Sequence, residues 1–295
     1  MSASPPTVSP RLRVYGTGLV HSLGGLAEVA RAVQQHRHTP SFAPAGTDGL
    51  GEHIAPKALR RIPHYARMGL AAALQALQAL PPQVERADLA LVVATAHAGQ
   101  KMGLDFMDSI LDDGPRLSSP TAFSHAVNNM GAGLISLHLG IHGPCCTVTQ
   151  FGLSLAGALQ ASGLLLHGGQ APLVLLGCID EWDPRFTATC AAHLGHTTEG
   201  YSEGAAFFLL GRADDVPCGL TEIEHAGPGL AVSWDTPDPQ ATPTPAHADV
   251  YGTTPLAPAL DTLLALQAQR VARISCTNGV GNGTSGRQAV IHVYA

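Results

Sequence analysis

Residues 143–154 read GPCCTVTQFGLS. The Gly143-Pro144 pair predicts a turn, and residues 146–149 predict a short strand directly after it. A helix rich in small residues is predicted over 153–166, and residues 172–178 predict a further buried strand. The order turn, strand, helix and strand is typical of an α/β layered fold.

The same alternation extends in both directions along the chain. The continuous apolar run LALVVA (89–94) predicts a strand that is buried on both faces of a sheet. Apolar residues at helical spacing predict a helix over 65–80, and Pro81-Pro82 end it. We also expect strands at 12–15, 203–210, 272–276 and 289–294, and helices at 25–35, 101–111, 122–139 and 256–268.

One segment of low complexity interrupts this pattern. Residues 226–248 read AGPGLAVSWDTPDPQATPTPAHA, and Pro, Ala and Thr dominate them. Such a composition predicts a surface linker.

Composition narrows the classes of function. Of the 295 residues, 45% are hydrophobic and only 13% are charged, which indicates a compact fold and favours a partner that covers part of the exterior. The net charge of −6, without a basic stripe, argues against nucleic acid as a partner. No stretch of ~20 clean apolar residues predicts a membrane span. The six cysteines form no C-x-x-C pair, so we expect reduced thiols in a cytoplasmic protein, with no metal site and no cofactor.

Several stretches in a fixed order resemble the β-ketoacyl synthases, the ketosynthase branch of the thiolase-fold enzymes. They are VYGTGLV (14–20) with LG (23–24), SPTAF (119–123) with VNNMGAG (127–133), GPCCTV (143–148), SEGAA (202–206) and NGVGNG (278–283). The resemblance implies a thiolase-like α-β-α-β-α layered sandwich. It further implies an N-terminal ketosynthase-like half at 1–180 and a shortened C-terminal half at 181–295, which contains the Pro-rich segment 226–248.

In the resembling family, a cysteine at the start of a buried helix attacks an acyl thioester, and two histidines assist decarboxylation and stabilise the oxyanion. The cysteine falls nine residues after the glycine of the Gly-Pro turn, and this chain has Gly152 there. The motif of the first histidine is absent, and Thr253 or Thr254 stands near the position of the second. The resemblance therefore predicts no catalytic residue, and Val280 takes the place of the phenylalanine gate.

A retained fold without catalytic groups resembles the chain-length factors, which are the inactive partners of type II polyketide ketosynthases. The resemblance implies a heterodimer with an active ketosynthase, in which the strand at 146–149 pairs across a two-fold axis, and an acyl chain bound to acyl carrier protein. Candidates for the acyl tunnel and the interface are Phe123, Asn128, Asn129, Met130, Cys146, Thr147, Val148, Thr149, Gln150 and Phe151. Chain-length factors often have glutamine at the cysteine position, but Gln150 lies two residues before it, and a hydrogen-bonding role near a turn is favoured.

Two other functions are open. An acyltransferase or decarboxylase on the same fold could use Gln150, Ser154, Cys145 or Cys146, although packing is favoured for both cysteines. A homodimeric acyl-binding scaffold protein is the third hypothesis.

Overall fold

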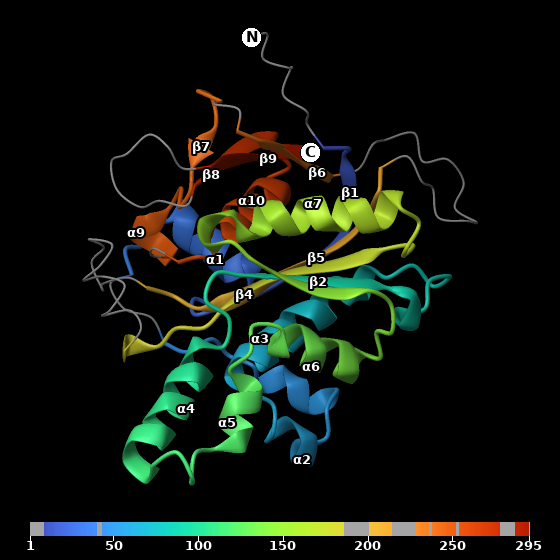
Figure 1. The fold of residues 1–295 in the computed structure, drawn as a ribbon. Coiled ribbons are helices and arrows are strands. Elements are labelled where there is room, and N and C mark those ends of the chain that lie inside the picture. Colours follow the sequence, from blue (N-terminus) through green and yellow to red (C-terminus); the bar gives the residue numbers. More distant parts are fainter. Residues whose placement is uncertain are drawn as a thin grey trace, which may run out of the picture.

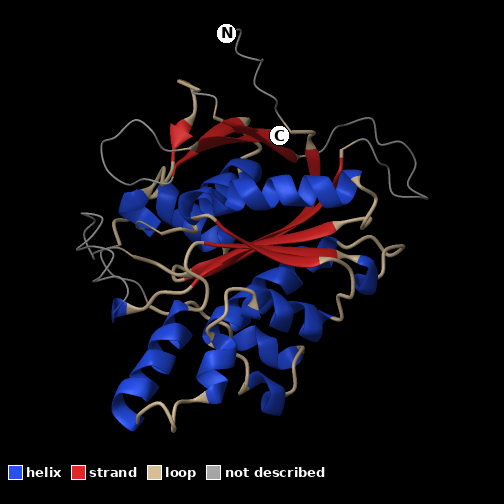
Figure 2. Cartoon of the chain, in the orientation of Figure 1, coloured by secondary structure: helices blue, strands red, loops and turns tan. Residues whose placement is uncertain are grey.

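The computed structural model describes residues 9–39, 43–185, 201–213, 228–235, 238–251, 254–277 and 287–294. Within them, nine strands form one sheet in the order β3-β2-β4-β5-β1-β6-β9-β8-β7. The sheet is folded into two layers with helices between them (Figure 1 and Figure 2). Strand β1 joins the layers, since it pairs with β5 along most of its length and with β6 only at Leu12 and Arg13.

The first layer holds the strands that lead to the candidate site. They are β1 (Leu12–His21), β2 (Ala90–Thr95), β3 (Cys145–Thr149), β4 (Val174–Asp180) and β5 (Gly204–Arg212). Strand β2 is parallel to β3 and β4, while β5 is antiparallel to β4 and β1. Every residue of β2 and β4 is buried, which confirms the prediction from their continuous apolar runs.

The second layer consists of β6 (Gly229–Trp234), β7 (Thr242–Pro243), β8 (Ala272–Thr277) and β9 (Gln288–Tyr294). Its inner face adds Leu230, Ile274 and Ile291 to the core. In the described part of the chain, no helix lies beyond its outer face (Figure 1). Polar groups occupy that face instead, including a 2.9 Å hydrogen bond between Ser233 and His292. The second half is therefore shortened at its outermost layer, and one face of its antiparallel sheet is polar.

Helices α1 (Leu26–Gln34), α7 (Ser154–His167), α9 (Ala248–Tyr251) and α10 (Ala257–Gln267) are close to the inner faces of the two layers (Figure 1). Helix α7 contacts β2 and β4 on one side and β6 and β9 on the other. A helix covered on two sides has little room for a polar stripe, which explains the small, apolar residues of its sequence.

The remaining helices lie on the other side of the first layer: α2 (Pro56–Leu59), α3 (His64–Ala76), α4 (Gln100–Asp113), α5 (Pro120–His125) and α6 (Met130–Leu139). Of these, α3 and α6 pack on the strands. Helix α3 packs against β1 at Gly18, where a Cβ atom would collide with the carbonyl oxygen of Ala72. Helix α6 approaches α3 at Gly131, where a Cβ atom would collide with the ring of Tyr65. Short 3-10 helices lie at Asp48–Glu52, Leu77–Ala79, Arg86–Asp88 and Phe151–Leu153. None of the described helices is long and apolar enough to cross a membrane.

Two sequence predictions are wrong. The single helix expected over 122–139 is two helices, α5 and α6, because the exposed turn Val127-Asn128-Asn129 separates them; asparagine favours caps and turns over helix interiors. The surface linker expected over 226–248 contains β6, which is inserted between β1 and β9 and is almost wholly buried. The predictions for Thr253, for Val280 and the turn at 278–283, and for Cys190 and Cys218 concern residues outside the described ranges.

Candidate functional site

The turn between β3 and α7 is strained. Phe151 has a φ of 48°, in the left-handed region that phenylalanine rarely adopts. That conformation costs about 1–2 kcal/mol for a residue with a side chain, so surrounding contacts must enforce it. Gly152 follows at once, in the 3-10 turn Phe151–Leu153 that leads into α7.

The buried hydroxyl of Ser154 is one of those contacts. Its Oγ accepts a hydrogen bond from the backbone N–H of Gln150 at 2.8 Å. It lies 2.9 Å from the carbonyl oxygen of Thr95 and 2.8 Å from that of Phe151, and it donates its proton to one of them. Ser154 is 3% exposed, so its hydroxyl joins β2 to the turn and is not presented to a substrate.

Asp180, the last residue of β4, fixes the loop that follows β2. Its carboxylate accepts hydrogen bonds from Thr95 Oγ1 at 3.1 Å, the Ala96 N–H at 3.1 Å and the His97 N–H at 3.0 Å. Complete burial raises the pKa of Asp180 to about 7, even though these hydrogen bonds oppose the rise. Ala98, in the same loop, has a φ of 55°, and its N–H donates to Thr95 Oγ1 at 2.7 Å.

His97 lies between this loop and the strained turn. Its ring faces that of Phe151, with 5.8 Å between the ring centroids. Burial lowers the pKa of His97 to about 4, so the imidazole is neutral near pH 7. A neutral imidazole can exchange a hydrogen bond with a ligand but supplies no positive charge for an oxyanion.

A second group of buried carboxylates lies at the same edge of the sheet. Glu203 Oε1 is 2.7 Å from His64 Nε2 and accepts the Ala45 N–H at 2.8 Å, while its Oε2 accepts the Trp182 N–H at 3.1 Å. The neighbouring Glu181 is 7% exposed, and its Oε2 has no hydrogen-bond partner among the described residues. Burial raises the pKa of Glu181 to about 7. Its carboxyl can therefore change protonation state near neutral pH.

The residues that the sequence resemblance aligned with catalytic positions can be located in the structure. Gly152 has no side chain that could attack a thioester. Thr254 is buried, and its Oγ1 accepts a 3.3 Å hydrogen bond from the N–H of Leu256 at the start of α10. The two cysteines near the turn, Cys145 and Cys146, are exposed on β3, and partial burial raises the pKa of each thiol. A raised pKa leaves less thiolate, the form that attacks acyl groups.

Most of the predicted interface residues lie on one face. Strand β3 is the outermost strand of its layer, and it contacts α6 and α7. Cys146, Thr149 and Gln150 are exposed on it, and Thr147 and Val148 are half-buried. The two helices that contact β3 and the turn after it carry large exposed apolar side chains: Leu137 of α6 is 73% exposed, Leu164 of α7 is 71% exposed, and Phe151 is 60% exposed.

Other predicted residues lie elsewhere. Met130 is buried, and its methyl group lies close to Gly99. Asn128 and Asn129 are exposed in the turn before α6, and Phe123, which is 58% exposed, belongs to α5. The side chain of Gln150 lies against Gly157 on α7, where a Cβ atom would collide with its amide oxygen. Gln150 therefore packs on the outside of α7.

Sequence analysis missed Thr95, His97 and Asp180 as members of the site. Each lies at or just after the carboxyl end of β2 or β4. In α/β sheets, ligands and functional groups gather at the carboxyl ends of parallel strands. Polar residues directly after the apolar runs 89–94 and 172–178 were the signal that could have identified them.

Comparison with known proteins places these features in a family. A search of curated proteins finds no match. Among solved structures, the ishigamide ketosynthase/chain length factor matches with a TM-score of 0.70 and 17% identity, over 96% of this chain and 98% of that chain. AntDE:AntF (apo), a type II PKS acyl-carrier protein in complex with its ketosynthase bound to the hexaketide, matches with a TM-score of 0.68 and 14% identity, over 97% and 99% of the two chains. A ketosynthase (ApeO) in complex with its chain length factor (ApeC) from Xenorhabdus doucetiae matches with a TM-score of 0.63 and 15% identity, over 95% and 98%.

These likenesses confirm the thiolase-like ketosynthase fold that the sequence motifs implied. The sequence itself matches the profile of the family described as beta-ketoacyl synthase, N-terminal domain, over residues 34–226. That match spans more than half of the chain, and the chain therefore belongs to the beta-ketoacyl synthase family.

Proposed function

We propose that this chain is a non-catalytic, ketosynthase-like subunit of the chain-length-factor type. It pairs with an active β-ketoacyl-ACP synthase and shapes the acyl tunnel of that enzyme. One observation carries the proposal: the chain has the ketosynthase fold, but Gly152 stands where the resemblance places the nucleophile of the family.

Condensation needs groups that these positions do not offer. A thiolate must attack the acyl thioester, and donors must stabilise the enolate that forms when a malonyl unit loses carbon dioxide. Gly152 has no thiol, and Thr253 and Thr254 would replace two-nitrogen imidazoles with single hydroxyl groups. The partner would supply the cysteine and both histidines, and this chain would be a pseudoenzyme.

The face around β3 is suited to a partner. An edge strand leaves one row of backbone N–H and C=O groups unpaired, and a strand of a second subunit can continue the sheet there. Leu137, Phe151 and Leu164 would then bury apolar area that is exposed in the isolated chain. Cys146, Thr147, Val148 and Thr149 would form the central contact.

The acyl tunnel would run beside this contact. Phe151 and Phe123 are mostly exposed and can reach a partner, whereas Met130 is buried and would act from within this subunit. Asn128 and Asn129 offer amide groups at the rim. In this arrangement the bulk of Phe123, Met130 and Phe151 sets the length of acyl chain that fits.

The solved neighbours support the choice of partner. Two of them are a ketosynthase with a chain length factor, and the third is an acyl-carrier protein in complex with its ketosynthase. We therefore propose a carrier-bound acyl chain as the ligand, in type II polyketide, polyene or fatty-acid-like biosynthesis. We place the complex in the cytoplasm and retain the division of the chain into halves at 1–180 and 181–295.

Two alternatives have weaker support. An acyltransferase or decarboxylase would need a nucleophile, but the hydroxyl of Ser154 is buried and engaged, and the thiols of Cys145 and Cys146 have raised pKa values. A homodimeric acyl-binding scaffold could use the same β3 face with a second copy. The composition of the complex separates that alternative from the favoured one.

The test is co-expression of the chain with the ketosynthases encoded beside it. We expect a 1:1 heterodimer by light scattering that elongates carrier-bound acyl chains, with loss of that activity when this chain is omitted. Leu137→Asp should prevent the complex, whereas Val271→Asp, at an equally exposed apolar residue before β8, should not. A homodimer that ignores those ketosynthases would overturn the proposal, as would condensation by the isolated chain.

A further inference from the structure

Helix α4 has no buried residue of its own. None of its fourteen residues, from Gln100 to Asp113, is buried, and the helix packs mainly on α5. In Figure 1, α4 and α5 extend away from the sheet at the lower left. A helix of this length is marginal in water without packing, so its placement depends on contacts at its sides.

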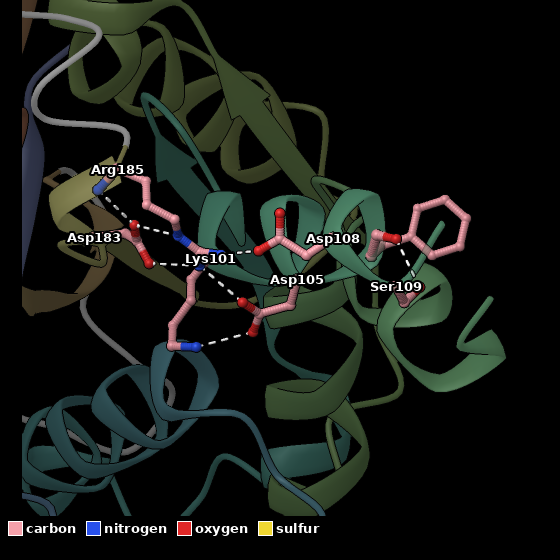
Figure 3. A network of polar contacts seen from close by, with 7 residues as sticks. Lys101, Asp105, Asp108, Ser109, Asp183 and Arg185 are labelled. Atoms are coloured by element: carbon pink, nitrogen blue, oxygen red, sulfur yellow. Dashed lines mark hydrogen bonds and ion pairs between the residues drawn. The ribbon is translucent and has the colours of Figure 1, made fainter. Parts of the chain in front are cut away.

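Arg185 supplies such contacts from the end of β4 (Figure 3). Its guanidinium donates to both oxygens of Asp183, from Nε at 3.0 Å and from one terminal nitrogen at 2.8 Å. The Asp183 carboxylate also accepts the backbone N–H of Arg185 at 2.9 Å and is nearly buried. Asp183 therefore orients the guanidinium in a bidentate pair, the geometry in which arginine binds most specifically.

The remaining donors of the same guanidinium face α4. They contact Asp108 at 2.6 Å and Asp105 at 2.8 Å, two residues on one side of the helix. Lys101 binds the other oxygen of Asp105 at 2.9 Å. Partial burial alone would raise the pKa of Asp105, but the hydrogen bonds from Lys101 and Arg185 outweigh it and lower the pKa.

The charges make Arg185 the central member of this network. Three carboxylates, Asp105, Asp108 and Asp183, face two cations, Arg185 and Lys101. Without the guanidinium, Asp183 on the sheet side would repel Asp105 and Asp108 on the helix side, and Lys101 forms a direct ion pair only with Asp105 among these three carboxylates. Arg185 therefore provides the attraction between α4 and the segment that follows β4, because its guanidinium pairs with carboxylates on both sides.

Two contacts between α4 and α5 make the position of Phe123 depend on that of α4. The ring of Phe106 on α4 lies against that of Phe123 on α5, with 5.3 Å between the centroids. Ser109 on α4 also accepts the N–H of Ser119, the N-cap residue of α5, at 3.1 Å. A glycine flanks α4 at each end: Gly99 precedes it, and Gly114, with a φ of 82°, follows it.

We propose that Arg185 is a positioning residue, which locks the α4–α5 arm (residues 100–125) so that Phe123 is presented to the partner subunit in one orientation. The inference rests on the proposed function for its final step, because the arm then fixes one wall of the acyl tunnel. Arg185 itself touches neither substrate nor partner in this scheme. It acts through α4, and its loss changes which acyl lengths are made.

The first test uses hydrogen exchange of the full-length chain alone. In Arg185→Ala, amides of residues 100–125 should exchange about tenfold faster, while those of β2 and β4 should be unchanged. Arg185→Lys keeps the charge but loses the bidentate geometry of the guanidinium. Its exchange rates in residues 100–125 should be intermediate between those of Arg185→Ala and the unmodified chain. Arg116→Ala is the matched control, since Arg116 is an exposed arginine of the same arm that makes no ion pair with a described residue. High salt screens the ion pairs of Arg185, so it should also speed amide exchange in the arm of the unmodified chain.

The second test measures products of the complex with the ketosynthase. Arg185→Ala should broaden the distribution of acyl lengths, Arg185→Lys should restore it in part, and Arg116→Ala should leave it unchanged. Unchanged exchange in the arm would overturn the lock, and faster exchange with unchanged products would overturn the positioning role. If the unmodified chain alters the products of no ketosynthase, the proposed function fails, and the exchange result still decides whether Arg185 locks the arm.

Discussion

The phenyl ring of Phe151 stands edge-on to the imidazole of His97, with an angle of 61° between the ring planes. The two rings come from the carboxyl ends of β3 and β2, and each lies at or beside a residue with positive φ, Phe151 in one case and Ala98 in the other. Strain of this kind persists where the surrounding structure enforces it. The contact therefore marks a part of the fold whose shape the surrounding structure enforces, beside the position that we propose lacks a nucleophile.

Replacement of Phe151 by asparagine should separate stability from binding. Asparagine tolerates the left-handed conformation, so relief of strain offsets the loss of a mostly exposed ring. We expect the free energy of unfolding of the isolated chain to change by less than about 1 kcal/mol. Affinity for the ketosynthase should fall about tenfold or more, because an exposed aromatic anchor is lost. Denaturant unfolding measures the free energy of unfolding, and interferometry measures the affinity for the ketosynthase. Equal affinities of Phe151→Asn and the unmodified chain would exclude Phe151 from the interface.

Ser154→Ala should destabilise the chain. The substitution leaves the Gln150 N–H and the Thr95 carbonyl oxygen without their buried partner, at a cost of about 1–3 kcal/mol. Urea unfolding measures the loss. Acyl labelling of the chain by a reactive thioester should not change, and a labelling signal that disappears in this variant would instead identify Ser154 as a nucleophile.

Gly152→Cys should create a reactive thiol but no condensing enzyme. Gly152 is not among the described residues with positive φ, so a side chain is compatible with its backbone. A thiol here lies at the turn that leads into α7, where the helix dipole lowers its pKa. Iodoacetamide at pH 7 should modify it about tenfold faster than Cys145 or Cys146. Condensation of malonyl thioesters by this variant alone would show that the missing histidines are not required.

The thiols of Cys145 and Cys146 report directly on the β3 face. Both are exposed in the isolated chain, whereas Cys178 and Cys276 are buried. Alkylation followed by peptide mass spectrometry should label the first pair in the free chain and protect it in the complex. Cys178 should resist alkylation both in the free chain and in the complex. Equal labelling of Cys145 and Cys146 with and without the ketosynthase would place the interface on another face.

Glu181→Gln should flatten the dependence of stability on pH. The pKa of Glu181 is raised in the folded chain, so its contribution to stability is present below 4.5 and is lost as pH rises through about 7. At 1.36 kcal/mol per pH unit, the rise from 4.5 to about 7 corresponds to roughly 3 kcal/mol. The unmodified chain should therefore lose more stability between pH 5 and pH 8 than the variant does.

The groups that face Glu181 are His64, Glu203, Lys101 and Asp183, and all are present in both proteins. One of them responds to the substitution: Glu181 helps to raise the pKa of His64, so its removal also reduces the contribution of His64 to the pH dependence. The hydrogen bond to Glu203 raises the pKa of His64, which adds a slope of the same sign to each curve. Parallel curves for the two proteins would show that Glu181 does not ionise in this range.

Where the sequence pattern was strong, it predicted the elements well. The apolar run that became β2 and the periodic segment that became α3 were both placed within two residues of their observed starts. Burial on both faces removes polar residues from a strand, so such strands are visible in sequence.

Strand β6 was missed because its apolar residues lie within a segment rich in Gly, Pro and Thr. Leu230 and Val232 alternate toward the core, but two positions are too few to outweigh that composition. Only pairing with β9 and β1 makes this segment a strand, and pairing between distant segments is not encoded in local pattern.

Less of the candidate site follows from sequence. The count from the Gly-Pro turn to Gly152 stays a prediction, and the backbone strain at Phe151 follows from contacts of Ser154 with Gln150 and Thr95, which are up to 59 residues apart. The Arg185 network was not foreseen for the same reason, since Asp105 and Asp108 meet Arg185 only after β4 is folded beside β2.

The exposed edge of β3 has a consequence for how much of this chain a cell can tolerate. Under the proposed function, copies synthesised in excess of the ketosynthase present an exposed edge strand together with the exposed side chains of Leu137, Phe151 and Leu164, and such edges associate with one another. Balanced production of the two subunits, rather than the affinity of the finished complex, then governs the yield of usable protein. A host that expresses this chain alone should accumulate aggregates that disappear when the partner is made at the same rate.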